Sequence, residues 1–269
     1  MLTSFSTRSL RWTAVALAGA GSLLGTQAWA QESTDSWNFT AGMGVVSQPK
    51  YPGSGDTKVS ALPMFSASHG RYFIGGLPGA GVPAGVGAFL VQDEHWRVGV
   101  GLGGNLDKPR KESDSARLHG MGDISATALG SVFASYSDSW WKVGGHVVTD
   151  LAGKDQGTRA TLDLEGRYSP MERLMLTAGP SITWADSKYT QTFFGVTAAQ
   201  SASSGLATYT AKSGINSVSF NVGVNYQLTQ QWGLGARLSA SSLRGDAADS
   251  PITEKKTQTT VGVFASYRF

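Results

Sequence analysis

Cysteine is absent from all 269 residues of the sequence. Its absence excludes disulfide bonds, cysteine-ligated zinc, iron–sulfur clusters and a lipid anchor attached through cysteine. The remaining residues predict no cofactor site and no metal site. An exported chain of this kind needs another source of stability, and a closed, fully hydrogen-bonded sheet in lipid would supply it.

Charged residues are few, at 15% of the chain, and the formal net charge is only +3 despite a pI near 9.1. Arg8 and Arg11 lie in a segment that we expect to be removed, which lowers the net charge to about +1. Because no basic cluster remains elsewhere, we expect no nucleic-acid binding.

Long apolar runs are absent after residue 30. Before it, Arg8 and Arg11 precede the apolar, alanine-rich residues 12–24, and Ala28-Trp29-Ala30 fits the small-x-small cleavage rule. The run is shorter than the roughly 20 residues that a membrane-spanning helix needs. We therefore predict a cleaved secretory signal peptide over residues 1–30, followed by one domain over residues 31–269.

Glycine, in contrast, is abundant, with 35 residues and no Gly-X-Y period. These glycines lie inside segments in which apolar and polar residues alternate. Glycine within a strand marks bulges, curvature or close backbone approach, as the wall of a barrel requires.

Alternation with a period of two recurs along the chain after residue 31. In the last segment, one face carries Thr259, Val261, Val263, Ala265, Tyr267 and Phe269, and Phe264 interrupts the other, polar face. Such segments are about ten residues or longer, as in transmembrane strands, whereas strands of soluble sheets have about five or six. Aromatic residues near the segment ends also favour a membrane barrel over a soluble β-sandwich.

Turn signals divide the chain into about twelve strands, centred near residues 37–46, 57–67, 71–77, 83–91, 95–105, 120–136, 140–151, 158–169, 173–185, 216–228, 231–243 and 257–269. The even-numbered connections are short, and the odd-numbered ones include the long stretches 106–119, 186–215 and 244–256. Bacterial barrels have short periplasmic turns and longer outer loops.

We therefore predict an all-β, transmembrane, antiparallel up-and-down β-barrel of about 12 strands, with 10 and 14 as alternatives. The N- and C-termini would be periplasmic, and the chain would lie in the lipid of a Gram-negative outer membrane. Its final strand ends with Tyr267 and Phe269, which resembles the signal read by the barrel-assembly machinery.

The lumen-facing positions of these strands include many charged residues. Two interpretations are open: a charged constriction that selects solutes, and an ion-pair network that fills a narrow barrel. The second is favoured, because no ring of a single charge sign is visible. The candidate residues are Arg97, Lys142, His146, Asp150, Asp163, Glu165, Arg167, Arg237 and Arg268.

The connection over residues 186–215 is unusually long, and loops of this size are usually functional or disordered. One hypothesis is that it folds into the barrel and narrows the pore, with Phe193 and Phe194 as anchors.

Enzymatic chemistry is not expected. Catalysis by a nucleophile requires a base and an orienting group beside it. Of the four histidines, His69 and His95 fall at predicted periplasmic turns and His146 faces the predicted lumen. His119 lies at the predicted outer rim with Asp114 and Asp123. A histidine near two carboxylates is commonplace, so we predict no catalytic residues.

Several motifs resemble those of the MltA-interacting protein (MipA/OmpV) family, and they cover nearly the whole chain after residue 31. They are Tyr51-Pro52-Gly53-Ser54-Gly55-Asp56, Leu118-His119-Gly120-Met121-Gly122-Asp123-Ile124, Thr183-Trp184-Ala185-Asp186 with Tyr189, Phe193-Phe194-Gly195-Val196, Gln200-Ser201, Ser204-Gly205-Leu206, Tyr209, Ser242-Leu243-Arg244-Gly245-Asp246-Ala247, Asp249-Ser250-Pro251-Ile252 and Tyr267-Arg268-Phe269.

The resemblance implies a non-enzymatic scaffold that holds a lytic transglycosylase and a penicillin-binding protein together, and so links the cutting and the building of peptidoglycan. Other members of the family are similar to surface antigens or adhesins. The predicted barrel shows only short turns to the periplasm, which is little area for a standard interface. The alternative functions are a narrow, porin-like solute channel, which the polar lumen supports, and a surface antigen or adhesin.

Overall fold

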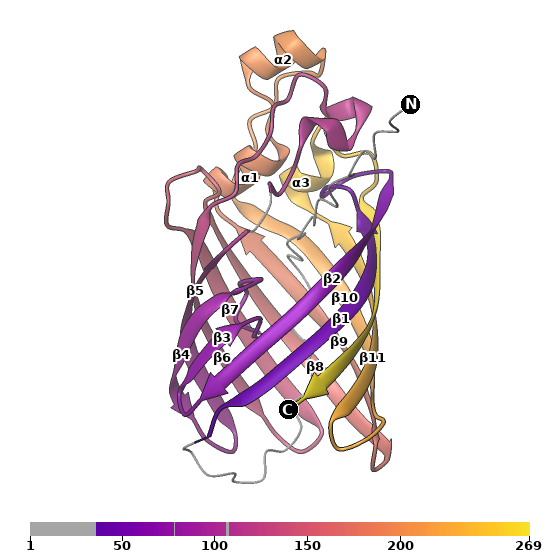
Figure 1. Cartoon of the computed structure of the whole chain (residues 1–269). Coiled ribbons are helices and arrows are strands. Elements are labelled where there is room, and N and C mark those ends of the chain that lie inside the picture. Colours follow the sequence, from indigo (N-terminus) through magenta and orange to yellow (C-terminus); the bar gives the residue numbers. More distant parts are fainter. Residues whose placement is uncertain (1–35, 78, 106–107) are drawn as a thin grey trace, which may run out of the picture.

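The computed structural model describes residues 36–77, 79–105 and 108–269. The predicted signal peptide, residues 1–30, lies outside the described residues. Twelve antiparallel strands form a closed barrel, in which each strand pairs with its neighbours in the sequence and β1 pairs with β12 (Figure 1). The prediction of a twelve-strand, up-and-down barrel is confirmed.

The strands are β1 (Asn38–Pro49), β2 (Thr57–His69), β3 (Tyr72–Gly75), β4 (Gly85–Gln92), β5 (Trp96–Gly104), β6 (Ala128–Ser137), β7 (Trp141–Asp150), β8 (Thr158–Met171), β9 (Leu174–Ala185), β10 (Gly214–Gln227), β11 (Trp232–Leu243) and β12 (Thr257–Arg268). All but β3 and β4 have at least nine residues, enough to cross the apolar part of a membrane.

The strands expose one face and cover the other. In β10, Val218, Phe220, Val222 and Val224 are each exposed by 38–51%, whereas the residues between them are buried or half-buried. The apolar residues of the period-two pattern thus form the outer, lipid-facing surface, and the polar residues face the lumen, as in outer-membrane barrels.

Two strands are shorter than predicted, and glycines with positive φ lie where the predicted strand is interrupted or ends. We predicted a strand over 120–136, but Gly120 and Gly122 have φ of 79° and 72°, and β6 begins only at Ala128. We predicted a strand over 71–77, but Gly75 has a φ of 95°, and β3 ends there.

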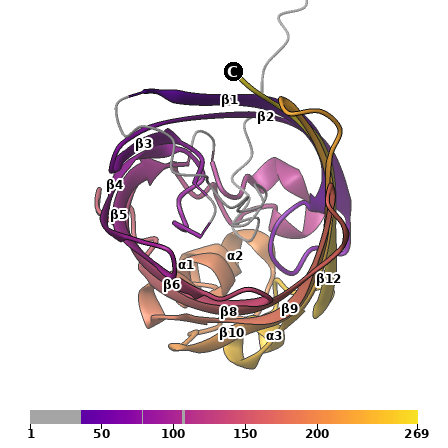
Figure 2. The same cartoon turned by 90° about the horizontal axis from the view of Figure 1, so that it is seen from below.

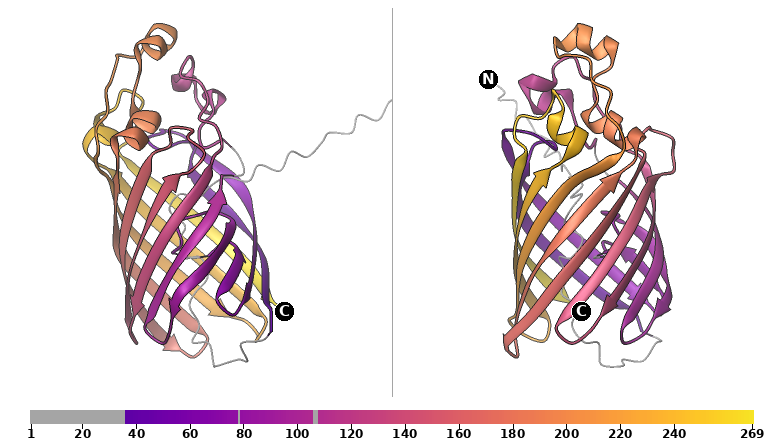
Figure 3. Two further views of the ribbon diagram at one scale, coloured as in Figure 1. Left: turned by 90° about the vertical axis from the view of Figure 1, so that its left-hand side faces the viewer. Right: turned by 180° about the vertical axis from the view of Figure 1, so that it is seen from behind.

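The two ends of the barrel differ, as Figure 3 shows. At the short-turn end, the connections are residues 70–71, 93–95, 138–140, 172–173 and 228–231. At the long-loop end, they are residues 50–56, 76–84, 105–127, 151–157, 186–213 and 244–256. Both β1 and β12 reach the short-turn end, where the amide of Phe269 donates to the carbonyl of Phe39 (3.1 Å).

Aromatic side chains contact one another around the short-turn end. The contacts join Trp37 with Phe39, Trp96 and Trp141 with Tyr136, and Tyr267 with Trp232 and Phe269. Amphipathic rings favour the boundary between lipid and water. This girdle therefore marks one edge of the membrane.

Within the described residues, the long connections contain the α-helices α1 (Ser187–Phe194), α2 (Ala198–Ser204) and α3 (Gly245–Asp249) and the 3₁₀ helices η1 (Glu112–Asp114) and η2 (Ala116–Leu118). Within the part of the chain that the structure describes, no helix is long and apolar enough to cross a membrane. In Figure 1, α1 and α3 lie at the mouth of the barrel and α2 stands above it.

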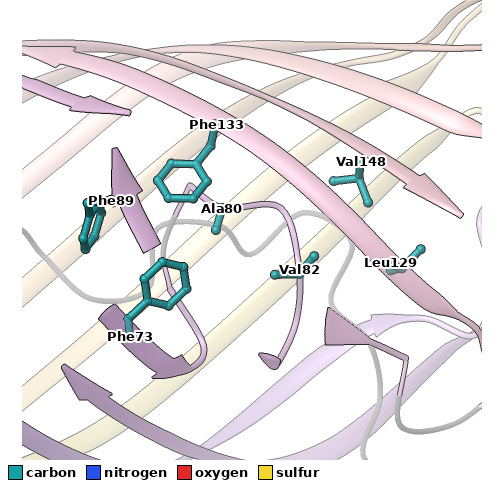
Figure 4. Packing of buried hydrophobic residues seen from close by; sticks show 7 residues of the cluster. All are labelled: Phe73, Ala80, Val82, Phe89, Leu129, Phe133 and Val148. Carbon is teal, nitrogen blue, oxygen red and sulfur yellow. The ribbon is translucent and has the colours of Figure 1, made fainter. Parts of the chain in front are cut away.

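The connection between β3 and β4 turns into the barrel. We call residues 79–84 the inward segment. Ala80 and Val82 on this segment are buried among Phe73, Phe89 and Phe133 of the barrel wall (Figure 4). The three phenyl rings lie 5.4–6.1 Å apart, centroid to centroid, so the segment is held by an apolar cluster inside the lumen.

Glycine at lumen-facing positions is a steric requirement that can be tested at Gly235. Phe264, the exception in the predicted polar face of β12, lies opposite Gly235, and a Cβ on this glycine would be 2.1 Å from the ring. We expect Gly235→Ala to destabilise the barrel by about 1–3 kcal/mol, because overpacking forces side chains from their rotamers. Urea unfolding in lipid vesicles measures this free energy.

The matched control is Gly262→Ala on the lumen face of β12, where the nearest atom to an added Cβ is 3.8 Å away. An equal loss of stability in the two variants would contradict the steric explanation.

Candidate functional site: the lumen and its four-loop cap

The lumen contains two cavities. Figure 2 shows the barrel wall around the lumen, seen from below. The cavity nearer the long-loop end has a volume of about 1020 Å³, and the one nearer the short-turn end about 520 Å³. They share the lining residues Lys142, Asp163, Glu165 and Arg237, so they adjoin at mid-barrel. This is more open volume than the favoured interpretation, a lumen filled by ion pairs, would leave.

The structure places most of the predicted lumen residues on these cavities. Lys142 Nζ lies 3.8 Å from Asp163 Oδ2, and Arg167 Nε donates to Glu165 Oε1 at 2.9 Å. The residues that line one or both cavities are Arg97, Lys142, His146, Asp163, Glu165, Arg167, Arg237 and Arg268.

Glycines give these charged side chains room to lie along the wall. An added Cβ at Gly144 would be 3.1 Å from both carboxylate oxygens of Asp163. One at Gly223 would be 2.5 Å from Thr177 Oγ1 and 3.7 Å from Arg237 Nη2. The polar wall therefore depends on the glycines that alternate with it.

Asp150 was predicted to face the lumen, and it has the same phase in β7 as Lys142 and His146, but it lines neither cavity. Its carboxylate accepts hydrogen bonds from the hydroxyl of Thr127 and from the amides of Ala152 and Gln156, the last two at 3.0 Å. Asp150 is the final residue of β7, and at a strand end the unpaired amides of the following turn compete for a carboxylate. It therefore organises the connection over residues 151–157.

Arg159, which the sequence analysis missed, connects the lumen with the long-loop end. Its Nη2 donates to the carbonyl of Gly81 in the inward segment at 3.4 Å, and its guanidinium carbon lies 5.9 Å from the centre of the Tyr189 ring in α1. Arg159 has the same phase as Asp163 in β8, which is the signal that would have found it.

The inward segment lies tightly against the wall at Gly81. This residue has a φ of 76°, and an added Cβ would be 2.4 Å from His146 Cδ2 and 2.6 Å from Val148 Cγ2. Only glycine therefore allows the segment to approach β7 this closely.

Four connections at the long-loop end pack together. We call them the four-loop cap: residues 50–56, 108–127, 186–213 and 244–256. One apolar cluster in the cap joins Tyr51, Leu118, Met121, Val196 and Ile252. A second cluster, at the mouth of the barrel, joins Ile124, Phe193, Phe194, Leu243, Ala247 and Ala248.

Hydrogen bonds between the loops complete the cap. Tyr51 donates its hydroxyl to Ile252 O and to Glu254 Oε2, both at 3.2 Å. Gln200 Nε2 donates to Met121 O at 2.8 Å. Since these partners come from distant parts of the sequence, the four loops form one unit.

Arg110 is buried inside the cap, with an exposed fraction of 2%. Its Nη1 donates to the carbonyl of Phe193 at 3.1 Å, and its own carbonyl accepts from the amide of Ile124 at 2.9 Å. Burial lowers the pKa of Arg110 to about 10, while the carboxylates of Asp114 and Asp123 act in the opposite direction.

The long connection between β9 and β10 lies in the cap at the mouth of the barrel. Phe193 and Phe194 are 6% and 2% exposed and pack with Ile124 and Leu243. Together with Tyr189 they also line the larger cavity from above. We had hypothesised that this connection folds inward, but the segment that enters the lumen is residues 79–84.

The sequence profile of the family described as "MltA-interacting protein MipA" matches residues 41–269. This chain belongs to that family. Relatives named MltA-interacting protein, from Escherichia coli (strain K12) and Shigella flexneri, are each 22% identical over 261 residues, which is 96% of this chain and the whole of each relative.

Solved structures with a similar barrel include an outer membrane channel from Pseudomonas putida F1, at 13% identity and a TM-score of 0.46, covering 87% of this chain and 96% of that one. The NanC porin is similar at 9% identity and a TM-score of 0.41, covering 86% of this chain and 99% of that one. The closed barrel of this MipA-family chain, with its apolar outer surface, makes it an integral protein of the Gram-negative outer membrane.

Most of the motifs that resemble those of the MipA family meet in the cap, whereas Tyr267-Arg268-Phe269 lies at the short-turn end. Tyr51 and Ile252, from motifs 201 residues apart, are joined by a hydrogen bond, and Ser250 Oγ donates to Phe194 O. The family pattern thus describes the packing of the cap more than any group of reactive side chains.

The acidic residues around His119 are occupied by structural contacts. His119 Nδ1 lies 3.1 Å from Glu112, whereas Asp114 accepts from the amide of Lys111 and Asp123 pairs with Lys108. The Lys108 ammonium and the amide of Glu112 lower the pKa of Asp123. The described residues contain no group of three or more histidine, aspartate and glutamate side chains suited to a metal ion.

We expect Phe194→Ala to loosen the cap, because removing a buried phenyl costs about 3–5 kcal/mol of packing free energy. Limited proteolysis of the refolded protein should then cleave within residues 186–213. The matched control is Phe220→Ala, which removes a lipid-facing phenyl that is 51% exposed and should leave the loop protected. Protection of the loop in both variants would contradict the prediction.

Tyr51 makes the cap sensitive to alkaline pH. Burial, followed by the Glu254 charge, raises the pKa of the Tyr51 hydroxyl to about 12. The stability from neutral Tyr51 is therefore fully present below about pH 10, the pKa of tyrosine in an unfolded chain, and is lost as the pH rises through about 12.

The tyrosinate absorbance of the wild-type protein, minus that of Tyr51→Phe, should accordingly titrate near pH 12. A difference spectrum that titrates near the ordinary pKa of tyrosine would show that Tyr51 is not held in the cap.

Proposed function

We propose that this chain is a non-enzymatic scaffold of the cell envelope, which holds a lytic transglycosylase and a penicillin-binding protein at the outer membrane. The observation that carries the proposal is its membership in a family with two full-length relatives named MltA-interacting protein. The engagement of its few candidate catalytic side chains in structural contacts agrees with a non-enzymatic role.

A periplasmic partner has to meet the short-turn end, which we propose faces the periplasm. Five connections of two to four residues and the end of the chain form this rim. A standard interface needs about 800 Å² per partner. A stable complex therefore has to contact several turns at once, and its contacts are mainly polar, because the rim carries residues such as Arg71, Glu94 and Asp138.

The test is binding of a purified soluble lytic transglycosylase to the refolded barrel in detergent. The charge reversals Arg71→Glu and Glu94→Lys, combined, should weaken binding by about tenfold or more, because like charges across an interface repel. Both residues are exposed turn residues outside the strands.

The matched control is Lys188→Glu combined with Lys212→Glu in the cap. This control should bind like the wild type. A loss of binding that is confined to the cap variant, or no binding by the intact protein, would contradict the proposed scaffold.

A second function, a narrow solute channel, is favoured by a separate observation. The two cavities adjoin at mid-barrel and extend toward both ends of the barrel. The cap covers one end, so we expect small single-channel steps in planar bilayers from the intact protein and larger steps after deletion of residues 190–210. Silence from both forms would contradict the channel.

A further inference from the structure

Charge is distributed unevenly between the lumen and the rest of the chain. The formal net charge of the whole sequence is only +3. The cavity nearer the short-turn end is nevertheless lined by six cationic residues and three acidic ones: Arg97, Lys142, Arg167, Arg173, Arg237 and Arg268 against Asp163, Glu165 and Glu172. A cleft with one prevailing sign of charge and low-dielectric walls concentrates ions of the opposite sign.

The carboxylates at mid-barrel are shared among several cations. Asp163 lies beside Lys142, and Glu165 accepts a hydrogen bond from Arg167. Arg237 also lies in the field of both carboxylates. Positive charge is therefore in excess here even after the ion pairs form.

Arg97 adds to this excess from the facing part of the wall. It lies close enough to Arg167 for their like charges to interact unfavourably. A guanidinium in such a place gains from an anion, and its planar donors match a carboxylate in a bidentate geometry.

The wall next to Arg97 is apolar. Arg97 and Gly99 occupy the same face of β5, and Gly99 pairs with both Phe89 and Phe133. These phenyl groups and Phe73 line the same cavity as the cationic residues. The cavity thus combines an apolar wall with a cationic one, and its volume of about 520 Å³ lies in the range of small-molecule sites.

We propose that this cavity binds a small organic anion, whose carboxylate contacts Arg97 and Arg237 and whose apolar part lies against Phe89 and Phe133. The site deepens the channel function, for which it would favour anionic solutes. Its occupancy, however, requires neither conduction nor a periplasmic partner.

In the experiment, benzoate is titrated into the refolded protein in detergent micelles, and calorimetry measures the heat of binding at each step. Saturable binding is expected. Arg97→Gln combined with Arg237→Gln should weaken it by about tenfold or more, because a hydrogen bond to a charged group contributes that much. The matched control, Arg244→Gln, removes an exposed cation from the cap, outside both cavities, and should leave benzoate binding unchanged. Heat-modifiable mobility on gels confirms that each variant is folded.

For a second variant we expect the opposite change, a stronger binding of benzoate. Asp163→Asn removes a negative charge from the cavity and should strengthen benzoate binding several-fold, which a purely structural role of these charges would not produce. Weakened binding in this variant, if it is folded, would contradict the proposal.

Other probes test the ligand class. Benzylamine, with the same ring and a positive charge, should bind at least tenfold more weakly than benzoate. Acetate and inorganic phosphate should also bind more weakly, because neither can cover the phenyl groups. Equal binding of phosphate would overturn the organic anion, and absence of saturable benzoate binding would overturn the site. Benzoate binding by a barrel that conducts no current would refute the channel and leave the site standing.

Discussion

The requirement that every backbone amide and carbonyl in lipid be hydrogen-bonded determines the rest of this structure. The β1–β12 ladder, from Thr40–Arg268 to Ser47–Val261, closes the sheet and removes its edges. Twelve strands leave a lumen wider than the side chains on the wall can fill. Three features fill or cover this space: an apolar inward segment on one side, shared ion pairs on the other, and a folded cap over one end.

Strand number, strand phase and most lumen residues could be predicted, because a strand in lipid obeys a period of two and each side chain has only two faces to choose between. Arg97, Glu165 and Arg237 follow from that rule alone. Asp150 follows the same rule but lines neither cavity, because its carboxylate accepts from the hydroxyl of Thr127 and from the amides of the following turn. The position of the inward segment depends on contacts of Gly81 with His146 and Val148, which no local pattern encodes.

The cap could be recognised in the sequence only as a set of unexplained motifs. Its apolar residues, such as Tyr51, Leu118 and Val196, have no common period, since they come from three different connections. Their resemblance to family motifs indicated that these segments have a common role, and the structure shows that they pack against one another. The cationic excess of the lower cavity was likewise hidden, because the ion pairs that offset part of it become visible only once β5, β7, β8 and β11 face a common space.

One hydrogen bond of the cap connects the two ends of the barrel's sequence. Tyr51 follows the first strand and Glu254 precedes the last, yet their side chains are joined, across a separation of 203 residues. This bond joins the loops on either side of the β1–β12 seam, so the ordered cap of this structure spans a closed seam. A ligand or antibody that recognises the joined loops would therefore bind closed barrels and would not bind barrels that are still open in the membrane.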